Sequence, residues 1–121
     1  MTYTFTLQIH TVSEANLRQH YRVKATRTKE QRVHASLLFV QWLWQQPGHE
    51  LPGPLKITLT RIAPRTLDSD NLARALKAVR DGIADALGRD DRDSATLQWA
   101  YDQSRGKPRE YAVGVTVEAE Q

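Results

Sequence analysis

The hydrophobic pattern changes its period near the middle of the chain, at Pro64. Before this proline, residues 55–60 alternate apolar and polar side chains, as a strand with one buried face does. After it, residues 70–87 place their apolar side chains at helical spacing, and Gly88 follows the last of them. Asp68 is a residue type that caps helix N-termini, and glycine commonly ends helices. The sequence therefore predicts a strand followed directly by an amphipathic helix.

Three further strands are predicted by the same two-residue period. Residues 2–9 alternate cleanly, and shorter alternating runs occur at residues 97–101 and 111–117. Between the last two runs, residues 103–110 (QSRGKPRE) contain a glycine and several basic side chains. This segment is interpreted as the tip of a basic hairpin.

A second helix is expected over residues 27–46, ahead of Pro47. Thr28 and Gln31 have the spacing of a capping box and would begin it. Four large apolar residues recur at helical spacing along it: Val33, Leu37, Val40 and Trp44.

Together these elements predict one domain over residues 1–121, in the order β-α-β-α-β-β. The expected fold class is α/β (α+β), a single small domain whose mixed sheet packs against two helices. The chain has no cysteine, which excludes disulfides and thiolate metal sites. It shows neither the pattern of a signal peptide nor an apolar run long enough to span a membrane, so a soluble intracellular protein is expected.

The carboxylates gather in one region although the chain carries a formal net charge of +3. Seven of its eight aspartates lie between residues 67 and 93. Asp68 and Asp70 stand where the predicted helix begins, and Asp90, Asp91 and Asp93 follow its C-terminal end, where the helix dipole disfavours acids. A solvated helix face is one explanation. The other is a hard divalent cation, since carboxylate oxygens are what Mg²⁺ or Mn²⁺ prefers.

Distance limits the second explanation. A helix of about 18 residues is about 27 Å long, and it separates Asp70 from Asp91. The two carboxylates share a cation within one chain only if the chain after Gly88 turns back along the helix, or if the helix is shorter. A dimer is the other way to bring them together.

These residues resemble a known signature. The run Asp68-Ser69-Asp70-Asn71-Leu72, then Lys77, Asp81 and Asp90-Asp91, is similar to the core pattern of the RusA-type Holliday junction resolvases. These are small metal-dependent crossover junction endodeoxyribonucleases of bacteria and phages. Residues 80–88, followed by Asp90-Asp91, resemble phage-type members further, and residues 16–25 resemble the family's segment after its first strand. The resemblance runs from the first strand to the last. The family's opening P-P-S is replaced here by Thr11-Val12-Ser13.

The resemblance implies a homodimer whose acidic active sites bind Mg²⁺, with Mn²⁺ as the alternative. The implied metal-binding and catalytic carboxylates are Asp68, Asp70 and Asp91, with Asp90 as the alternative to Asp91. The implied catalytic basic residue is Lys77, with Arg74 as the alternative. Lys77 is favoured because a lysine can lose or donate a proton while arginine effectively cannot.

A nuclease must also hold the DNA backbone, and basic side chains provide such sequence-independent contacts. A dense basic block lies between residues 18 and 32, and the predicted hairpin tip is basic as well. The residues expected to bind DNA are Arg18, His20, Arg22, Lys24, Arg27, Lys29, Arg105 and Lys107.

The sequence thus predicts a Mg²⁺-dependent, structure-selective endodeoxyribonuclease that resolves Holliday junctions or other branched DNA by phosphodiester hydrolysis. Its expected place is the cytoplasm of a bacterial cell, with a host or prophage gene as its source. The alternative is a phage or bacterial DNA-binding protein whose acidic cluster is structural and which cuts nothing. The two differ in their need for a divalent ion.

Overall fold

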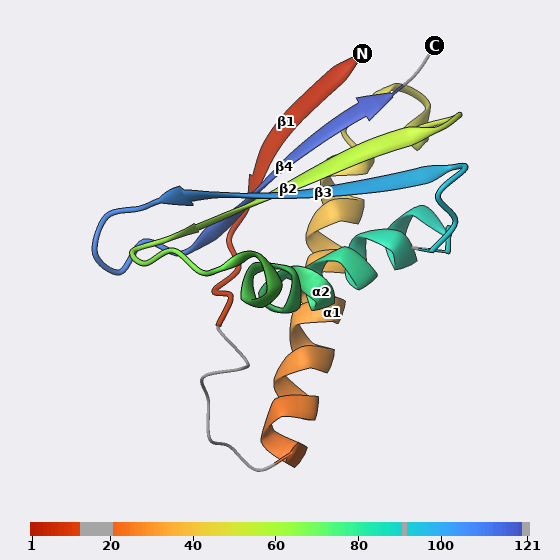
Figure 1. Cartoon of the computed structure of the whole chain (residues 1–121). Coiled ribbons are helices and arrows are strands. Elements are labelled where there is room, and N and C mark those ends of the chain that lie inside the picture. The colour runs from red at the N-terminus through yellow and green to blue at the C-terminus, as the bar shows by residue number, and fades with distance from the viewer. Residues whose placement is uncertain (13–20, 91, 120–121) are drawn as a thin grey trace.

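The computed structural model describes residues 1–12, 21–90 and 92–119. Within these ranges, four strands and two long helices follow one another as β1, α1, β2, α2, β3 and β4 (Figure 1). The strands are β1 (Thr2–Leu7), β2 (Leu55–Ala63), β3 (Leu97–Arg105) and β4 (Ala112–Ala119). The helices are α1 (Tyr21–Leu43) and α2 (Ser69–Leu87), with a short 3₁₀ turn, η2 (Pro47–His49), before β2. The predicted fold class, a small α+β domain with a mixed sheet and two helices, is confirmed.

The strands lie in the order β1-β4-β2-β3. β4 is antiparallel to both β1 and β2, whereas β2 and β3 are parallel. The predicted hairpin between the last two strands is therefore wrong, because β2 lies between β3 and β4. Alternation shows that a segment has one buried face but does not show which strand it pairs with. In the structure, the short loop after Arg105 carries the chain past the end of β2.

Both helices cover the same face of this sheet (Figure 1). The odd-numbered strand residues, such as Ile57, Leu59 and Val115, point into a core that also contains Phe39 of α1 and Leu76 of α2. The even-numbered residues form the outer sheet face, which is rich in threonine. In the part of the chain that the structure describes, neither helix is apolar enough over a sufficient length to cross a membrane.

Helix α2 begins at Ser69, one residue before the predicted start, and ends at Leu87 as predicted. Asp68 is the N-cap, and its Oδ1 accepts the Asn71 backbone N–H at 2.9 Å. Gly88 closes the helix in the left-handed region, with φ of 67°, which glycine adopts without the steric cost that a Cβ would bring. The predicted apolar side of α2 is buried.

Helix α1 differs from the prediction at both ends. It begins at Tyr21 rather than at position 27 and ends at Leu43 rather than at position 46. Thr28 lies inside the helix, so the capping box is wrong. Gln31 instead donates a side-chain hydrogen bond to the His10 carbonyl at 3.0 Å, which ties α1 to the segment after β1.

The four apolar residues noted along α1 do not form its core-facing side. Val33, Leu37 and Trp44 are 50%, 59% and 64% exposed, and they lie within about 40° of one another around the helix. The core-facing side consists of Ala35, Leu38, Phe39, Trp42 and Leu43. Helix α1 therefore carries two apolar stripes, and the one formed by Val33, Leu37, Val40 and Trp44 faces away from the core.

Helices α1 and α2 pack closely against each other at Gly82. A Cβ at this position would collide with the Arg32 backbone carbonyl and lie 2.9 Å from the Ala35 Cβ. Only a hydrogen atom fits there, so Gly82 sets how closely the two helices cross.

We expect Gly82→Ala to destabilise the protein by about 1–3 kcal/mol, because an added methyl group overpacks against backbone that cannot rotate away. Urea unfolding measures this change. Helix propensity alone predicts the opposite sign, a gain of about 1 kcal/mol, so a more stable variant would show that the crossing is looser than described.

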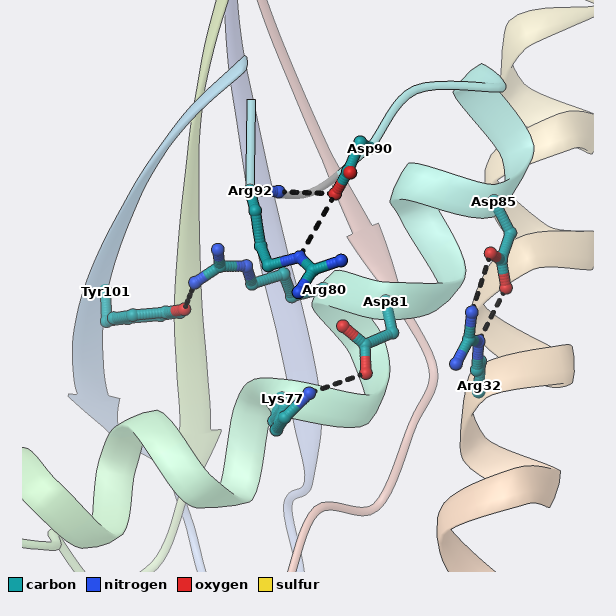
Figure 2. A network of polar contacts seen from close by, with 8 residues as sticks. All are labelled: Arg32, Lys77, Arg80, Asp81, Asp85, Asp90, Arg92 and Tyr101. Carbon is teal, nitrogen blue, oxygen red and sulfur yellow. Dashed lines mark hydrogen bonds and ion pairs between the residues drawn. The ribbon is translucent and has the colours of Figure 1, made fainter. Parts of the chain in front are cut away.

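An ion pair joins the same two helices beside this crossing. Arg32 Nε lies 2.6 Å from Asp85 Oδ2, and Arg32 Nη2 donates to Asp85 Oδ1 at 2.9 Å (Figure 2). This hydrogen bonding lowers the pKa of the Asp85 carboxyl below its usual value. Both side chains remain about half exposed, at 49% and 46%.

Arg32→Met is expected to lower the free energy of unfolding by about 0.2–1 kcal/mol at pH 7, as for other exposed pairs. A carboxyl with a lowered folded pKa stabilises the fold above its unfolded pKa, and this stabilisation is lost as the pH falls through the folded pKa. The difference between variant and wild type should therefore shrink below about pH 4. Urea unfolding at pH 7 and pH 3 tests this, and an unchanged difference would mean that Arg32 acts through packing alone.

Candidate metal and nucleic-acid site

The predicted acidic pair lies at the N-terminal end of α2, just after the C-terminal end of β2 (Figure 1). Both Asp68 oxygens are used locally: Oδ1 accepts the Asn71 backbone N–H at 2.9 Å, and Oδ2 accepts the Asn71 side-chain amide at 3.1 Å. An ionised carboxylate has about four lone-pair directions, so Asp68 keeps capacity for a further ligand. Its position is explained by capping alone.

Asp70 is different. It lies in the first turn of α2, is exposed, and accepts no hydrogen bond from any residue that the structure describes. The positive end of the helix dipole favours a carboxylate there. Asp70 is therefore a carboxylate that the described fold leaves without a partner.

The pair has the right chemistry for a hard cation. Mg²⁺ often takes only one or two carboxylates, and waters and phosphate oxygens complete its octahedron. Among the described residues, no group of three or more aspartate, glutamate, histidine or cysteine side chains gathers closely enough to bind a metal ion. Within one chain, the described site thus supplies two carboxylates.

The end of β3 holds the loop that carries this pair. The Gln103 side chain binds the backbone of Leu67 twice, accepting its N–H at 2.9 Å and donating to its carbonyl at 2.7 Å. Arg105 donates to the Pro64 carbonyl at 3.2 Å. The loop before Asp68 is therefore fixed on rigid secondary structure, which positions ligands well.

Arg61 of β2 also holds the loop before Asp68, and the sequence analysis did not predict this role. It is only 5% exposed, and it donates to Thr11 Oγ1 at 3.1 Å and to the Arg65 carbonyl at 2.7 Å. Burial lowers the pKa of its guanidinium, and the Tyr111 phenol acts in the opposite direction. In the sequence, the signal for this role was that Arg61 occupies a core-facing position in the alternating pattern of β2.

Lys77 and Arg74 lie on the exposed side of α2. Lys77 Nζ is 3.0 Å from Asp81 Oδ2, an ion pair between residues four apart on the helix (Figure 2). Lys77 stands about 10 Å along the helix axis from Asp70, whereas Arg74 is one turn away. Arg74 is exposed and makes no ion pair with the described residues, so it is better placed than Lys77 to act beside Asp70.

Asp90 lies apart from Asp70. The chain after Gly88 does turn back along α2, and Asp90 lines a hollow of about 410 Å³ together with Lys77, Asp81 and Asp85. We call this the charged hollow; its other lining residues are Arg32, Ala84, Arg89 and Arg92. Since α2 rises about 16 Å from Asp70 to Asp81, Asp90 and Asp70 do not share a cation within one chain.

Contacts with Arg92 stabilise the Asp90 carboxylate. Asp90 Oδ1 accepts the Arg92 backbone N–H at 2.9 Å and lies 3.5 Å from its guanidinium (Figure 2). The backbone hydrogen bond, assisted by the guanidinium, lowers the pKa of the Asp90 carboxyl below its usual value. These contacts with Arg92 stabilise the Asp90 carboxylate near the unfavourable C-terminal end of α2, so its place there does not by itself indicate a metal ion.

The other described aspartates of this segment also have local partners. Asp81 and Asp85 pair with Lys77 and Arg32, and Asp93 accepts the Ala95 backbone N–H at 3.2 Å. Only the acid at position 70 stands alone among the described residues of the segment.

Three predicted site residues lie outside the described residues: Asp91, Arg18 and His20. Four of the expected DNA-binding residues, Arg22, Lys24, Arg27 and Lys29, occupy the N-terminal part of α1, which projects beyond the sheet (Figure 1). Arg105 and Lys107 lie at the end of the sheet where α2 begins. The structure thus brings Asp68, Asp70 and Arg105 to one end of the sheet and places the α1 residues on a separate projection.

Comparison with known proteins assigns no activity. An uncharacterized protein of Xylella fastidiosa (strain Temecula1) is 35% identical over 79 residues, which are 64% of this chain and 52% of that protein. The chain spans about half the length of this relative. No family model matches the chain.

Proposed function

We propose that this chain is a metal-dependent endodeoxyribonuclease that cuts branched DNA, with the four-way junction as its principal substrate. The observation that carries the proposal is the exposed Asp70 carboxylate, which stands beside Asp68 on a rigid helix end and has no hydrogen-bond donor among the described residues. The resemblance of residues 68–72 to the RusA-type signature supports it. A bacterial cytoplasm, where such DNA occurs, is the proposed location.

Asp68 and Asp70 would hold Mg²⁺, and Asp91 of a second copy would add a third carboxylate. When bound, the ion would activate a water molecule and neutralise charge on the phosphate. Arg74, one turn from Asp70, would stabilise the charge that develops on the phosphoryl oxygens. Lys77 would donate a proton, as proposed from the sequence. For this, the bound DNA would have to draw the Lys77 ammonium group away from Asp81. Arg105 would hold the DNA backbone beside the acids.

A second copy is part of the proposal for two reasons. Within one chain, Asp90 lies far along α2 from Asp70, and a dimer can bring the two ends of different α2 helices together. The exposed apolar stripe of α1 is the second reason, because exposed apolar surface of this kind marks a site of interaction with another molecule. We propose that a second copy of this chain covers it.

One observation favours the alternative of a DNA-binding protein that cuts nothing. Every described aspartate between positions 68 and 93 except Asp70 has a local partner that explains it. The acidic segment could therefore serve the fold alone. Metal dependence separates the two functions.

The wild-type protein should nick a synthetic four-way junction symmetrically in Mg²⁺ and leave it intact in EDTA. Asp70→Asn should slow cutting by about 100-fold or more, because a metal ion supplies several kcal/mol of transition-state stabilisation. Junction binding, measured in EDTA by fluorescence anisotropy, should remain.

Asp102→Asn is the matched control. It makes the same chemical change on the outer sheet face, where Asp102 is exposed, and should cut at close to the wild-type rate. Normal cutting by Asp70→Asn would remove Asp70 from the site. A wild-type protein that binds junctions but cuts none in Mg²⁺ or Mn²⁺ would establish the alternative.

The dimer has its own test. Light scattering after gel filtration should give twice the 13.8 kDa chain mass for the wild type and a single chain mass for Leu37→Glu. A charge in the middle of the apolar stripe should disfavour association, because a buried unpaired charge is costly. Leu37 is 59% exposed in the single chain, so circular dichroism should show an intact fold.

Thr6→Glu adds the same charge on the outer sheet face and should leave the dimer intact. A wild type with the mass of one chain, or a Leu37→Glu variant that is still dimeric, would show that the α1 stripe is not the subunit interface.

A further inference from the structure

A groove on the exposed side of α2 is lined by cations. It has a volume of about 350 Å³, and its lining residues are Ala73, Arg74, Lys77, Arg80, Arg92 and Tyr101. An adjoining hollow shares Arg80 and Arg92 and adds Trp99 of the edge strand β3. We call these two together the basic groove. None of the expected DNA-binding residues of α1 or of the loop after β3 takes part in it.

Charges of opposite sign are separated around α2. Four cations line the basic groove, and no carboxylate is among the described residues that line it. The carboxylates of Asp81, Asp85 and Asp90 lie instead in the charged hollow. Lys77 and Arg92 line both, so their acidic partners lie on the side away from the basic groove. The basic groove thus presents cations on one side of α2, a surface that suits a bound polyanion.

Arg80 is held in place at the centre of the basic groove. Its Nη1 donates to the Tyr101 hydroxyl at 2.7 Å (Figure 2), and its Cζ lies 5.2 Å from the centre of the Trp99 ring. A guanidinium fixed by a hydrogen bond and a cation–π contact loses little side-chain entropy when it binds an anion. Planar and always charged, it suits a phosphate well.

The row of cations runs along α2 from the acidic pair. Arg74, Lys77 and Arg80 follow one another at three-residue spacing and span about 9 Å of the helix axis. The row is therefore long enough to contact more than one phosphate of a single DNA strand. A strand in the basic groove would therefore lead to the N-terminal end of α2, where Asp68 and Asp70 lie.

We infer that the basic groove is a binding track for the phosphate backbone of one DNA strand, in which Arg80 and Arg92 are the principal contacts. The choice of DNA as the polyanion rests on the proposed function. Tyr101 is a positioning residue, since its hydroxyl orients Arg80 and adds no charge.

Equilibrium binding of a fluorescent four-way junction in EDTA tests the track without any cutting step. Arg80→Met and Arg92→Met should each weaken binding about three- to tenfold at low salt. Each should also reduce the slope of log K against log salt by about one, because each removes a phosphate contact. The Arg92 side chain is 84% exposed, so Arg92→Met should fold normally even if Arg80→Met does not. Tyr101→Phe should weaken binding less, with no change of charge.

Lys56→Met is the matched control, because it removes one positive charge from the outer sheet face. It should leave the salt slope unchanged. If Arg80→Met and Arg92→Met bind like Lys56→Met, the track is wrong while the nuclease proposal stands. If they lower the slope as expected but the wild type cuts nothing in Mg²⁺ or Mn²⁺, the track stands and the nuclease proposal fails. Equal competition by polyglutamate at matched charge would show a general polyanion site and overturn the assignment to DNA.

Discussion

The parallel pairing of β2 with β3 determines where the charged groups of this protein lie. Two parallel strands joined in sequence need a connection that returns the chain to the starting end of the sheet, and here α2 provides it. A strand of nine residues is about 30 Å long and a helix of 19 residues about 28 Å, so α2 matches the length that it must cover. The acids before α2 and Asp90 after it are therefore held apart within one chain.

The same topology explains which elements could be predicted. α2 carries its own boundaries, because Asp68 caps one end, Gly88 closes the other, and a single apolar side faces the sheet. α1 has apolar residues on two sides, so its periodicity does not distinguish the core-facing stripe from the exposed one. The pairing of β4 with β1 and β2 depends on contacts between distant segments, which alternation within a strand does not encode.

The candidate site was predicted in its parts more than in its arrangement. The sequence pattern singled out Asp68, Asp70 and Lys77, and the structure places them at the N-terminal end of α2 and along its exposed side. Hydrogen bonds that no spacing reveals supply the rest. The Arg92 backbone N–H donates a hydrogen bond to the Asp90 carboxylate, and the Gln103 side chain holds the loop before Asp68 in position. Acids at an unfavourable helix end are therefore weaker support for a metal ion than they appear in sequence, whereas an acid left without a partner, as at Asp70, is stronger.

The proposed association of two subunits would add a constraint that links these features. A homodimer with two-fold symmetry buries the same patch on both chains. The exposed stripe of α1 runs from Val33 to Trp44, and the same stretch of helix crosses α2 beside Gly82, near the later half of α2. A two-fold axis there, perpendicular to α2, would reverse the direction of this helix in the second chain. The two α2 helices would then run in opposite directions, which is the relative direction that pairing the separated acids across two chains requires. Covering the apolar stripe and completing the acidic site thus place compatible demands on a single axis.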